Sequence, residues 1–131
     1  MNAAKAVSKE VAKQEVDKWL DFKRVKARKR KSNEDSIETM IESFEDGTLI
    51  LDEKTHEIKL KLEWEVGGKK ELIFQPRLKM IDIHSRLKQT KNADERIMAY
   101  ICALTGQNTG VIGQCDPEDY SIAQTIAIFF F

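Results

Sequence analysis

The sequence predicts an α+β fold in which helices cover one face of a three-stranded antiparallel meander, with a long basic N-terminal helix. Residues 58–66, IKLKLEWEV, alternate apolar and charged side chains, which is the period of a half-buried strand. Later segments instead space apolar residues three and four positions apart, which is typical of amphipathic helices. Residues 3–31 contain neither Gly nor Pro and are rich in helix formers.

The first 31 residues are expected to form a helical arm, followed by an α+β domain of residues 32–131. We predict one helix over residues 3–31, in which Trp19 and Phe22 are apolar side chains able to dock. The arm ends in KRVKARKRK, with seven basic residues and no acid: Lys23, Arg24, Lys26, Arg28, Lys29, Arg30 and Lys31. We expect this helix to project from the domain or to swap onto a neighbouring copy.

The charges are segregated along the chain although they sum to zero. Residues 1–31 hold 11 Lys or Arg against 4 Asp or Glu, whereas residues 32–65 hold 3 against 11. This asymmetry indicates that the basic arm meets an acidic surface, either on this chain or on a second copy.

A short amphipathic helix and three strands are predicted after the arm. Ser32 is the expected N-cap of a helix over residues 33–45, and Gly47 stands where a helix end favours a left-handed residue. The buried face of this helix consists of Ile37, Met40, Ile41 and Phe44. TLILDE is the expected first strand, and Gly67-Gly68 marks a hairpin between residues 58–66 and KKELIFQ.

The hairpin register follows from one-sided burial. A three-residue loop would pair Trp64 with Leu72 and Leu62 with Phe74, whereas a two-residue loop would place Glu71 opposite Trp64. We therefore predict the three-residue loop, with Trp64 on the covered face.

Helices are predicted again once Pro76 has ended the last strand. The first carries a stripe of Met80, Ile83 and Leu87. Asn92 and Glu95 form a capping box for the second helix. The third begins at Asp116-Pro117.

The chain closes on three aromatic residues, Phe129, Phe130 and Phe131. The stripe of the last helix runs through Ile126 to Phe130, which predicts that Phe130 is buried. Phe129 and Phe131 then point elsewhere and are partly exposed on an isolated monomer. Both can line a partner groove, or they can pack against the sheet or a second subunit.

The sequence contains no residue pattern that is typical of a catalytic site. His56 falls in an expected turn and His84 on an expected helix, and neither belongs to a metal, nucleophile or phosphate motif. Nothing in the spacing of Cys115-Asp116 and His84 requires a site, and Cys102 suits a small core residue. We predict no catalytic, cofactor-binding or metal-binding residue, and a protein that is not an enzyme.

Composition favours a cytoplasmic protein. No apolar run approaches the roughly 18 residues of a membrane span, and MNAAKAVSKE lacks the apolar stretch of a signal peptide. The two cysteines have no framework spacing, so we expect them to be reduced.

The basic segment 23–31 also raises the alternative of a nucleic-acid-associated protein. However, no aromatic side chain interleaves with these cations to stack on bases, and the acidic block 32–65 would repel phosphate. We expect an acidic protein surface to be the partner instead.

The second half of the chain, roughly residues 56–131, resembles the tail assembly chaperones of long-tailed bacteriophages and prophages, the Mu-like type. The resemblance lies in KKELIFQPRLKMIDIHSRLK, ERIMAYICALTG and VIGQCDPEDYSIAQTIAIFFF. Its motif positions are Pro76-Arg77, Asp82, Leu104-Thr105-Gly106, Asp116, Asp119-Tyr120 and Phe129-Phe130. The chain departs from the usual family pattern by having QPRL where Arg precedes Pro.

The resemblance implies a non-enzymatic role in virion morphogenesis. Such chaperones bind the tape measure protein, keep it soluble, help to recruit tail tube protein and are absent from the mature virion. They often form homo-oligomers. We therefore expect Trp19, Phe22, Phe129 and Phe131 to contact a partner polypeptide.

The family also commonly makes a longer product by programmed ribosomal frameshifting. Three consecutive Phe codons can form the uridine-rich run that such a shift uses. We therefore hypothesise that Phe129–Phe131 marks this position, which sequencing of the gene would test.

Overall fold

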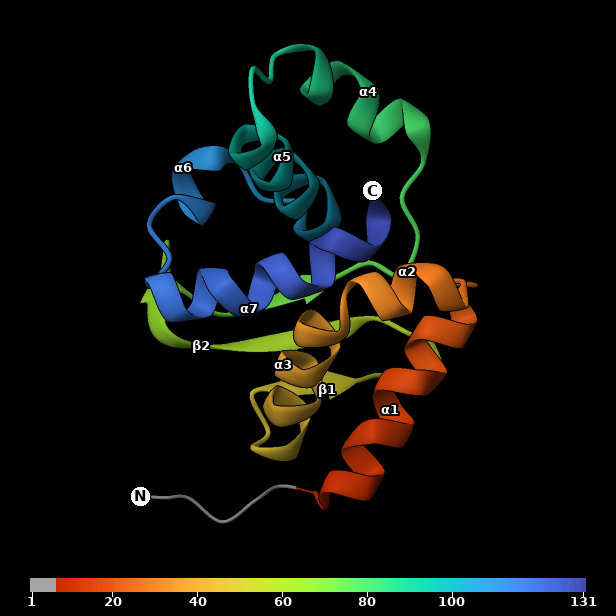
Figure 1. Ribbon diagram of the computed structural model, residues 1–131. Coiled ribbons are helices and arrows are strands. Elements are labelled where there is room, and N and C mark those ends of the chain that lie inside the picture. Colours follow the sequence, from red (N-terminus) through yellow and green to blue (C-terminus); the bar gives the residue numbers. More distant parts are fainter. Residues whose placement is uncertain (1–6) are drawn as a thin grey trace.

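Three antiparallel strands in the order β1-β2-β3 form the sheet of this protein, which has the predicted α+β architecture (Figure 1). The computed structural model describes residues 7–131, so residues 3–6 of the predicted N-terminal helix lie outside the described residues. The strands are β1 (Leu49–Leu51), β2 (Ile58–Val66) and β3 (Lys69–Phe74). The helices are α1 (Lys9–Phe22), α2 (Ala27–Ser32), α3 (Glu34–Glu45), α4 (Met80–Lys88), α5 (Ala93–Thr105), α6 (Thr109–Ile112) and α7 (Pro117–Ala127). Among the described residues, no helix combines the length and apolar character that crossing a membrane requires.

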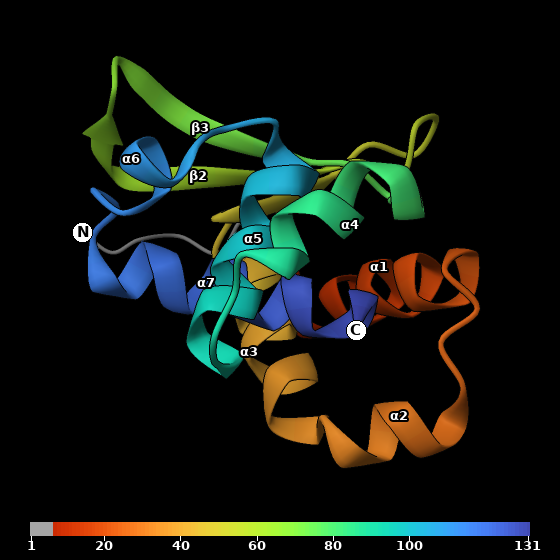
Figure 2. The same ribbon diagram turned by 90° about the horizontal axis from the view of Figure 1, so that it is seen from above.

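Helices cover one face of the sheet. Helix α3 packs on β1, α7 on β2 and α5 on β3, while α1 packs on α3. The covered face is made of Leu49, Ile58, Leu60, Leu72 and Phe74, all almost completely buried. Figure 2 shows α7, α3 and α1 on one side of the sheet and α2 farthest from it. The predicted helix-covered meander is therefore confirmed.

Helix α1 belongs to the core and does not project from it. Its buried residues, Ala12, Val16, Trp19 and Leu20, recur every three or four positions and lie in the same hydrophobic cluster as the covered sheet face. The expectation that this helix projects or swaps onto a neighbour is therefore wrong for residues 9–22. Half of its buried stripe consists of small Ala and Val side chains, which gave only a weak signal in the sequence.

The prediction of one helix over residues 3–31 is also wrong, because the chain turns sharply at Arg24. Arg24 has a φ of 58°, its N–H donates to the Asp21 carbonyl, and the Val25 N–H donates to the Leu20 carbonyl. This pair of bonds is the Schellman arrangement that ends many helices. It returns Val25 to the core and starts α2 in a new direction. The left-handed position usually holds Gly, and because Arg stands there instead, this turn cannot be recognised from sequence alone.

Ser32 does not cap the next helix as predicted. It ends α2, where its hydroxyl donates to a carbonyl one turn back, and Asn33 takes the N-cap position of α3 without a side-chain cap. The buried face of α3 nevertheless includes the predicted Met40, Ile41 and Phe44. Gly47 has the expected left-handed conformation, with a φ of 85°.

The β2–β3 hairpin closes in a tighter turn than the sequence predicted. Gly67 and Gly68 both have positive φ, and Val66 pairs with Lys69. Two consecutive left-handed residues are typical of a two-residue type I′ turn, whose twist suits the flanking strands. The predicted three-residue loop is therefore wrong.

A large bulge in β2 changes the predicted register. Leu72 pairs with Leu60 rather than with Trp64, and the pairing is interrupted between Lys61 and Val66. Residues 62–65 of β2 consequently lie opposite a single residue of β3, Lys70. The strict alternation breaks there, and Trp64, predicted to be covered, is 65% exposed.

The carboxylate of Asp119 holds this bulge. Its Oδ2 accepts a hydrogen bond from the Glu63 N–H at 2.9 Å and lies 3.5 Å from the Trp64 nitrogen, which also donates to it. Asp119 is only 3% exposed. Backbone N–H groups lose their usual acceptors where strand pairing is interrupted, and here Asp119 substitutes for the missing strand partner. It thereby fastens the first turn of α7 to β2.

The predicted helix starts in the C-terminal half are confirmed. Asn92 accepts from the Glu95 N–H at the start of α5, and Asp116 accepts from the Glu118 N–H at the start of α7, with Pro117 at the first position. The Glu95 carboxylate returns to the Lys91 N–H, one residue before its expected target.

Burial of the final aromatic residues is the reverse of the prediction. Phe129 is 3% exposed and Phe130 is half-buried. The chain tightens into a 3₁₀ turn, η1 (Ile128–Phe130), directly after α7. Three residues complete a 3₁₀ turn, so Phe129 falls on the same side as the buried Ile126. Phe131 is 47% exposed, as expected.

Asp119→Ala is expected to lower the free energy of unfolding by about 1–3 kcal/mol, because two backbone N–H groups at the bulge lose their charged acceptor. Urea unfolding measures the change. Glu118→Ala is the matched control, since Glu118 lies in the same helical turn but is exposed, and we expect a loss below about 0.5 kcal/mol. Equal losses in the two variants would contradict the role given to Asp119.

Candidate functional site

The described surface carries a groove at which several predicted contact residues meet. Its volume is about 440 Å³, and we call it the aromatic groove. The end of α1 and the connection from β3 to α4 form its walls, and the final aromatic residues form its floor. It is lined by Phe22, Lys23, Arg24, Pro76, Arg77, Leu78, Met80, Ile83, Tyr100, Phe129 and Phe130.

One wall depends on a connection that is tied to the core at both ends. The Gln75 N–H donates to the Leu104 carbonyl at 3.1 Å, just before Pro76. Ile83 is 2% exposed and is the one fully buried residue of α4, which packs on α5. Met80, predicted to lie on the buried stripe, is instead 69% exposed at the groove. Of the predicted buried stripe of Met80, Ile83 and Leu87, only Ile83 is therefore confirmed.

The floor of the groove is the aromatic cluster at the end of the chain. The Trp19 ring meets Phe129 edge-on, with ring centroids 6.1 Å apart, and lies 6.0 Å from Phe130. Tyr100 contacts Phe131 with centroids 4.8 Å apart. Trp19 is 1% exposed and Phe129 is 3% exposed, so these two residues, predicted to contact a partner, are buried in this structure. They support the groove from beneath.

Phe22 and Phe131 remain available at the surface, with exposures of 41% and 47%. Phe22 stacks on the His56 ring at a centroid distance of 3.9 Å and an interplanar angle of 8°. This contact holds Phe22 at the groove edge and gives His56 a packing role.

Lys23 lies across the groove floor. Its Nζ is 3.3 Å from the centre of the Phe130 ring and 5.7 Å from that of Trp19, which are cation–π contacts. Burial, and secondarily the charge of Lys29, lower the pKa of Lys23 to about 8. The rings favour the charged amine, while the loss of water disfavours it.

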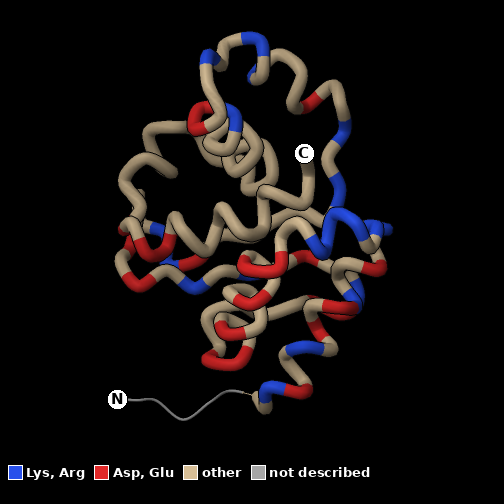
Figure 3. The backbone as a smooth tube through the Cα atoms, viewed as in Figure 1, with Lys and Arg blue, Asp and Glu red and all other residues tan. Residues whose placement is uncertain are grey.

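The charge of the groove lining has one sign. Lys23, Arg24 and Arg77 contribute to the lining, and no Asp or Glu does. Figure 3 shows basic residues of the α1–α2 segment and of the β3–α4 connection on the same side of the molecule. An apolar floor with a cationic rim suits a ligand that is apolar and acidic.

The other cations of the predicted electrostatic arm divide into two groups. Lys29 Nζ donates to the main-chain oxygens of Phe129 at 3.3 Å and of Phe131 at 2.6 Å. Arg30 bridges to Asp21 at 2.7 Å. Lys29 therefore holds the final residues, and Arg30 ties α2 to the end of α1. The exposed cations on or beside α2 are Lys26, Arg28 and Lys31.

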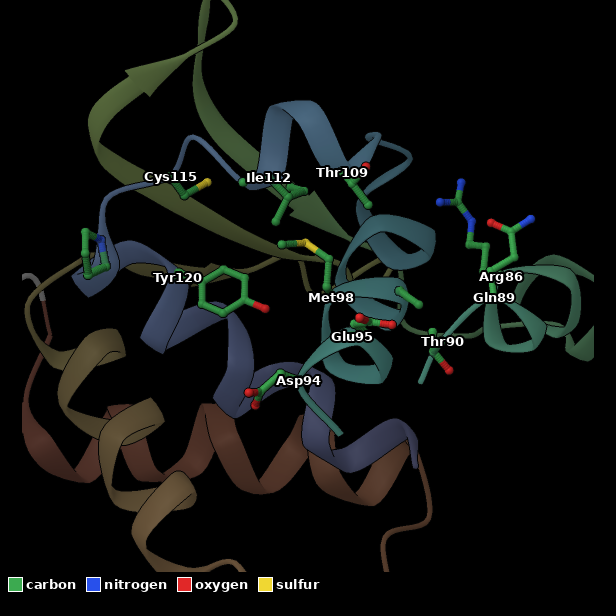
Figure 4. Close-up of a pocket in the computed structure, with 13 residues that line it drawn as sticks. Arg86, Gln89, Thr90, Asp94, Glu95, Met98, Thr109, Ile112, Cys115 and Tyr120 are labelled. Atoms are coloured by element: carbon green, nitrogen blue, oxygen red, sulfur yellow. The ribbon is translucent and has the colours of Figure 1, made fainter. Parts of the chain in front are cut away.

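A second cavity, of about 690 Å³, lies between α4, α5, α6 and the start of α7 (Figure 4). Met98, Ile112 and Tyr120 face its interior, and Arg86 shares its rim with carboxylates such as Asp94. The mixed charges of this rim favour no class of partner. None of the residues predicted to contact a partner lines it.

The residues considered for catalysis do not converge in this structure. Cys115 lines the cavity of Figure 4, whereas Asp116 caps α7 and the exposed His84 is not part of the lining. Burial, followed by the charge of Asp119, raises the pKa of the Cys115 thiol, which disfavours the reactive thiolate. Within residues 7–131, no three His, Cys, Asp or Glu side chains form a group suited to a metal ion.

Arg24→Gly is expected to raise the free energy of unfolding by about 0.5–1 kcal/mol, because Gly adopts a positive φ without the steric cost of a Cβ atom. Thermal and urea unfolding check this value. Lys26→Gly, at a position with a negative φ, should not stabilise the protein. A destabilised Arg24→Gly variant would show that the arginine side chain contributes more to the fold than its backbone conformation costs.

Stability should also respond to the titration of Lys23. The folded-state pKa of about 8 lies below the ordinary value of 10.5, so the unfolded chain binds more protons between these pH values. Stability from this group is therefore lost below pH 8 and gained as the pH rises towards 10.5. Relative to Lys23→Met, the wild-type protein should gain about 1 kcal/mol between pH 7 and pH 10, after allowance for solvent screening. Parallel pH profiles for the two proteins would contradict the lowered pKa.

No protein-family model, curated protein or solved structure matches this chain. The site is therefore defined by its own geometry, and the aromatic groove is the surface that unites an apolar floor, exposed aromatic residues and a single sign of charge.

Proposed function

We propose that this protein is a tail assembly chaperone of a long-tailed phage or prophage, which binds the tape measure protein through the aromatic groove. It acts by contact between polypeptides and breaks no covalent bond. Recruitment of tail tube protein and self-association belong to the same proposal. The observation that carries it is the aromatic groove, because a chaperone of an amphipathic polypeptide needs an exposed apolar surface beside solubilising charge.

The residues behind the resemblance support this proposal through their places in the fold. Pro76-Arg77 lines one wall of the groove, and Phe129-Phe130 forms its floor. Asp116 begins α7, and Asp119 fastens that helix to β2. The motif residues thus build or orient the surface that the function requires.

The nucleic-acid alternative is less well supported. Lys23 lies over aromatic rings, and Lys29 and Arg30 contact groups of the chain itself. The exposed cations of α2 are followed by Glu34 and Asp35 at the start of α3. A gel-shift assay with salt titration separates the alternatives, since phosphate contacts weaken steeply with salt.

Co-expression with a fragment of the tape measure protein from the same genome tests the function. We expect the fragment to remain soluble and to co-purify with the chaperone. Met80→Glu should abolish co-purification, because it places a charge on the exposed apolar edge of the groove. Val11→Glu is the matched control: Val11 is also an exposed apolar residue in the first turn of a helix, but it lies outside the groove.

An insoluble fragment and no complex with the wild-type protein would refute the function. Equal losses from Met80→Glu and Val11→Glu would instead refute the groove as the contact surface.

A further inference from the structure

We propose that the aromatic groove selects an amphipathic helical segment that carries carboxylates beside its apolar face. This inference rests on the proposed function in taking the groove as a surface for another polypeptide. It adds the chemical class of the bound segment.

The carboxylates are inferred from the groove's cations. Lys23 and Arg24 come from the end of α1, and Arg77 comes from the β3–α4 connection. The lining contains no acid to neutralise them, and none of the described ion pairs involves these three side chains. A purely apolar ligand would bury this charge without compensation, whereas a ligand carboxylate would pair with it. Arginine is especially suited to carboxylates because its donors are arranged as a planar fork.

The environment of Lys23 supports the same chemistry. Its amine lies over the Phe130 ring, and the neighbouring charge that acts on it is the cation of Lys29 on α2. Both the burial and this cation disfavour its protonated form. A carboxylate at the groove would favour the protonated amine of Lys23. Binding of the carboxylate would therefore offset the electrostatic cost that this amine bears in the free protein.

The backbone at Arg24 is an independent indication. Arg24 has a φ of 58° at the end of α1, where Gly would fit without strain. The position instead carries a long cation whose side chain lines the groove. Strained residues concentrate at functional sites, and here the strain coincides with the one-sided charge.

The helical form follows from the groove's backbone. A strand-like ligand that binds by adding to a sheet edge requires free main-chain donors and acceptors. Pro76 has no N–H, and the N–H of Gln75 already donates to Leu104. A helix satisfies its own backbone groups and needs from the groove only an apolar floor, here Phe130 and Met80, and a charged rim.

Synthetic helical peptides test the inference by fluorescence anisotropy with the full-length protein. Three labelled peptides share an apolar stripe of Leu and Phe at positions i, i+3, i+4 and i+7, and carry Glu, Gln or Lys along its borders. We expect the Glu peptide to bind about tenfold more tightly than the Gln peptide, and the Lys peptide to bind most weakly.

Variants of the protein locate the binding surface. Arg24→Gln and Arg77→Gln should each weaken binding of the Glu peptide by about fivefold to tenfold, with little effect on the Gln peptide. Lys26→Gln and Arg28→Gln are the matched controls, because these cations are exposed but outside the groove. They should change binding by less than about twofold. Circular dichroism checks that every variant is folded.

Equal affinity for the Glu and Gln peptides would overturn the inference. So would equal losses from the groove and control variants, which would indicate attraction to net positive charge alone. If the peptides fail to bind while a tape measure fragment co-purifies, the inference is wrong and the proposed function stands. If the Glu peptide binds at the groove but no tape measure complex forms, the inference stands and the proposed function is wrong.

Discussion

The packing of Trp19 on Phe129 and Phe130 is the interaction on which the arrangement of this molecule depends. It joins the first described helix to the end of the chain, with ring centroids about 6 Å apart in both pairs. Fully burying such side chains contributes about 1.5–3 kcal/mol each, and edge contacts between rings add to this. The buried indole N–H of Trp19 has no hydrogen-bond partner among residues 7–131, so the ring contributes through its hydrocarbon surface.

Several features of the aromatic groove follow from this contact. Because α1 is held against the chain end, Lys23 extends over Phe130, and the helix stops where Arg24 reaches the groove. Lys29, after the turn, donates to the last main-chain oxygens. Helix α7 is thus fixed at both ends, by Asp119 on the bulge of β2 and by Phe129 on Trp19. The groove is therefore supported by rigid elements rather than by a free terminal segment.

Much of the fold could be predicted from local patterns. The span of β2, the caps at Asn92 and Asp116, and three of the four residues predicted on the buried face of α3 depend on neighbours in the sequence, and these predictions were correct. The errors fell where tertiary contacts override the local pattern. Trp64 leaves the covered face because a distant carboxylate, Asp119, stabilises a bulge. Phe129 exchanges places with Phe130 because the helix tightens in its final turn.

The candidate site could be predicted only in part. The sequence marked Phe22, Lys23 and Arg24 as contact residues, but it placed them on a projecting arm. Pro76 and Arg77 were visible as part of a resemblance, without any sign that they face the end of α1. Helix breaking by a left-handed Arg24 leaves no compositional trace, since Gly is the residue that usually signals it. The groove exists only because of that turn, and so local sequence patterns could not reveal it.

The aromatic groove is the surface at which we propose that this protein holds another polypeptide. Hydrogen exchange of the protein, alone and bound to a tape measure fragment, tests it most directly. We expect binding to slow exchange in residues 22–25, 77–84 and 128–131, with little change around the cavity of Figure 4. Protection confined to that cavity or to the uncovered face of the sheet would show that the partner binds elsewhere.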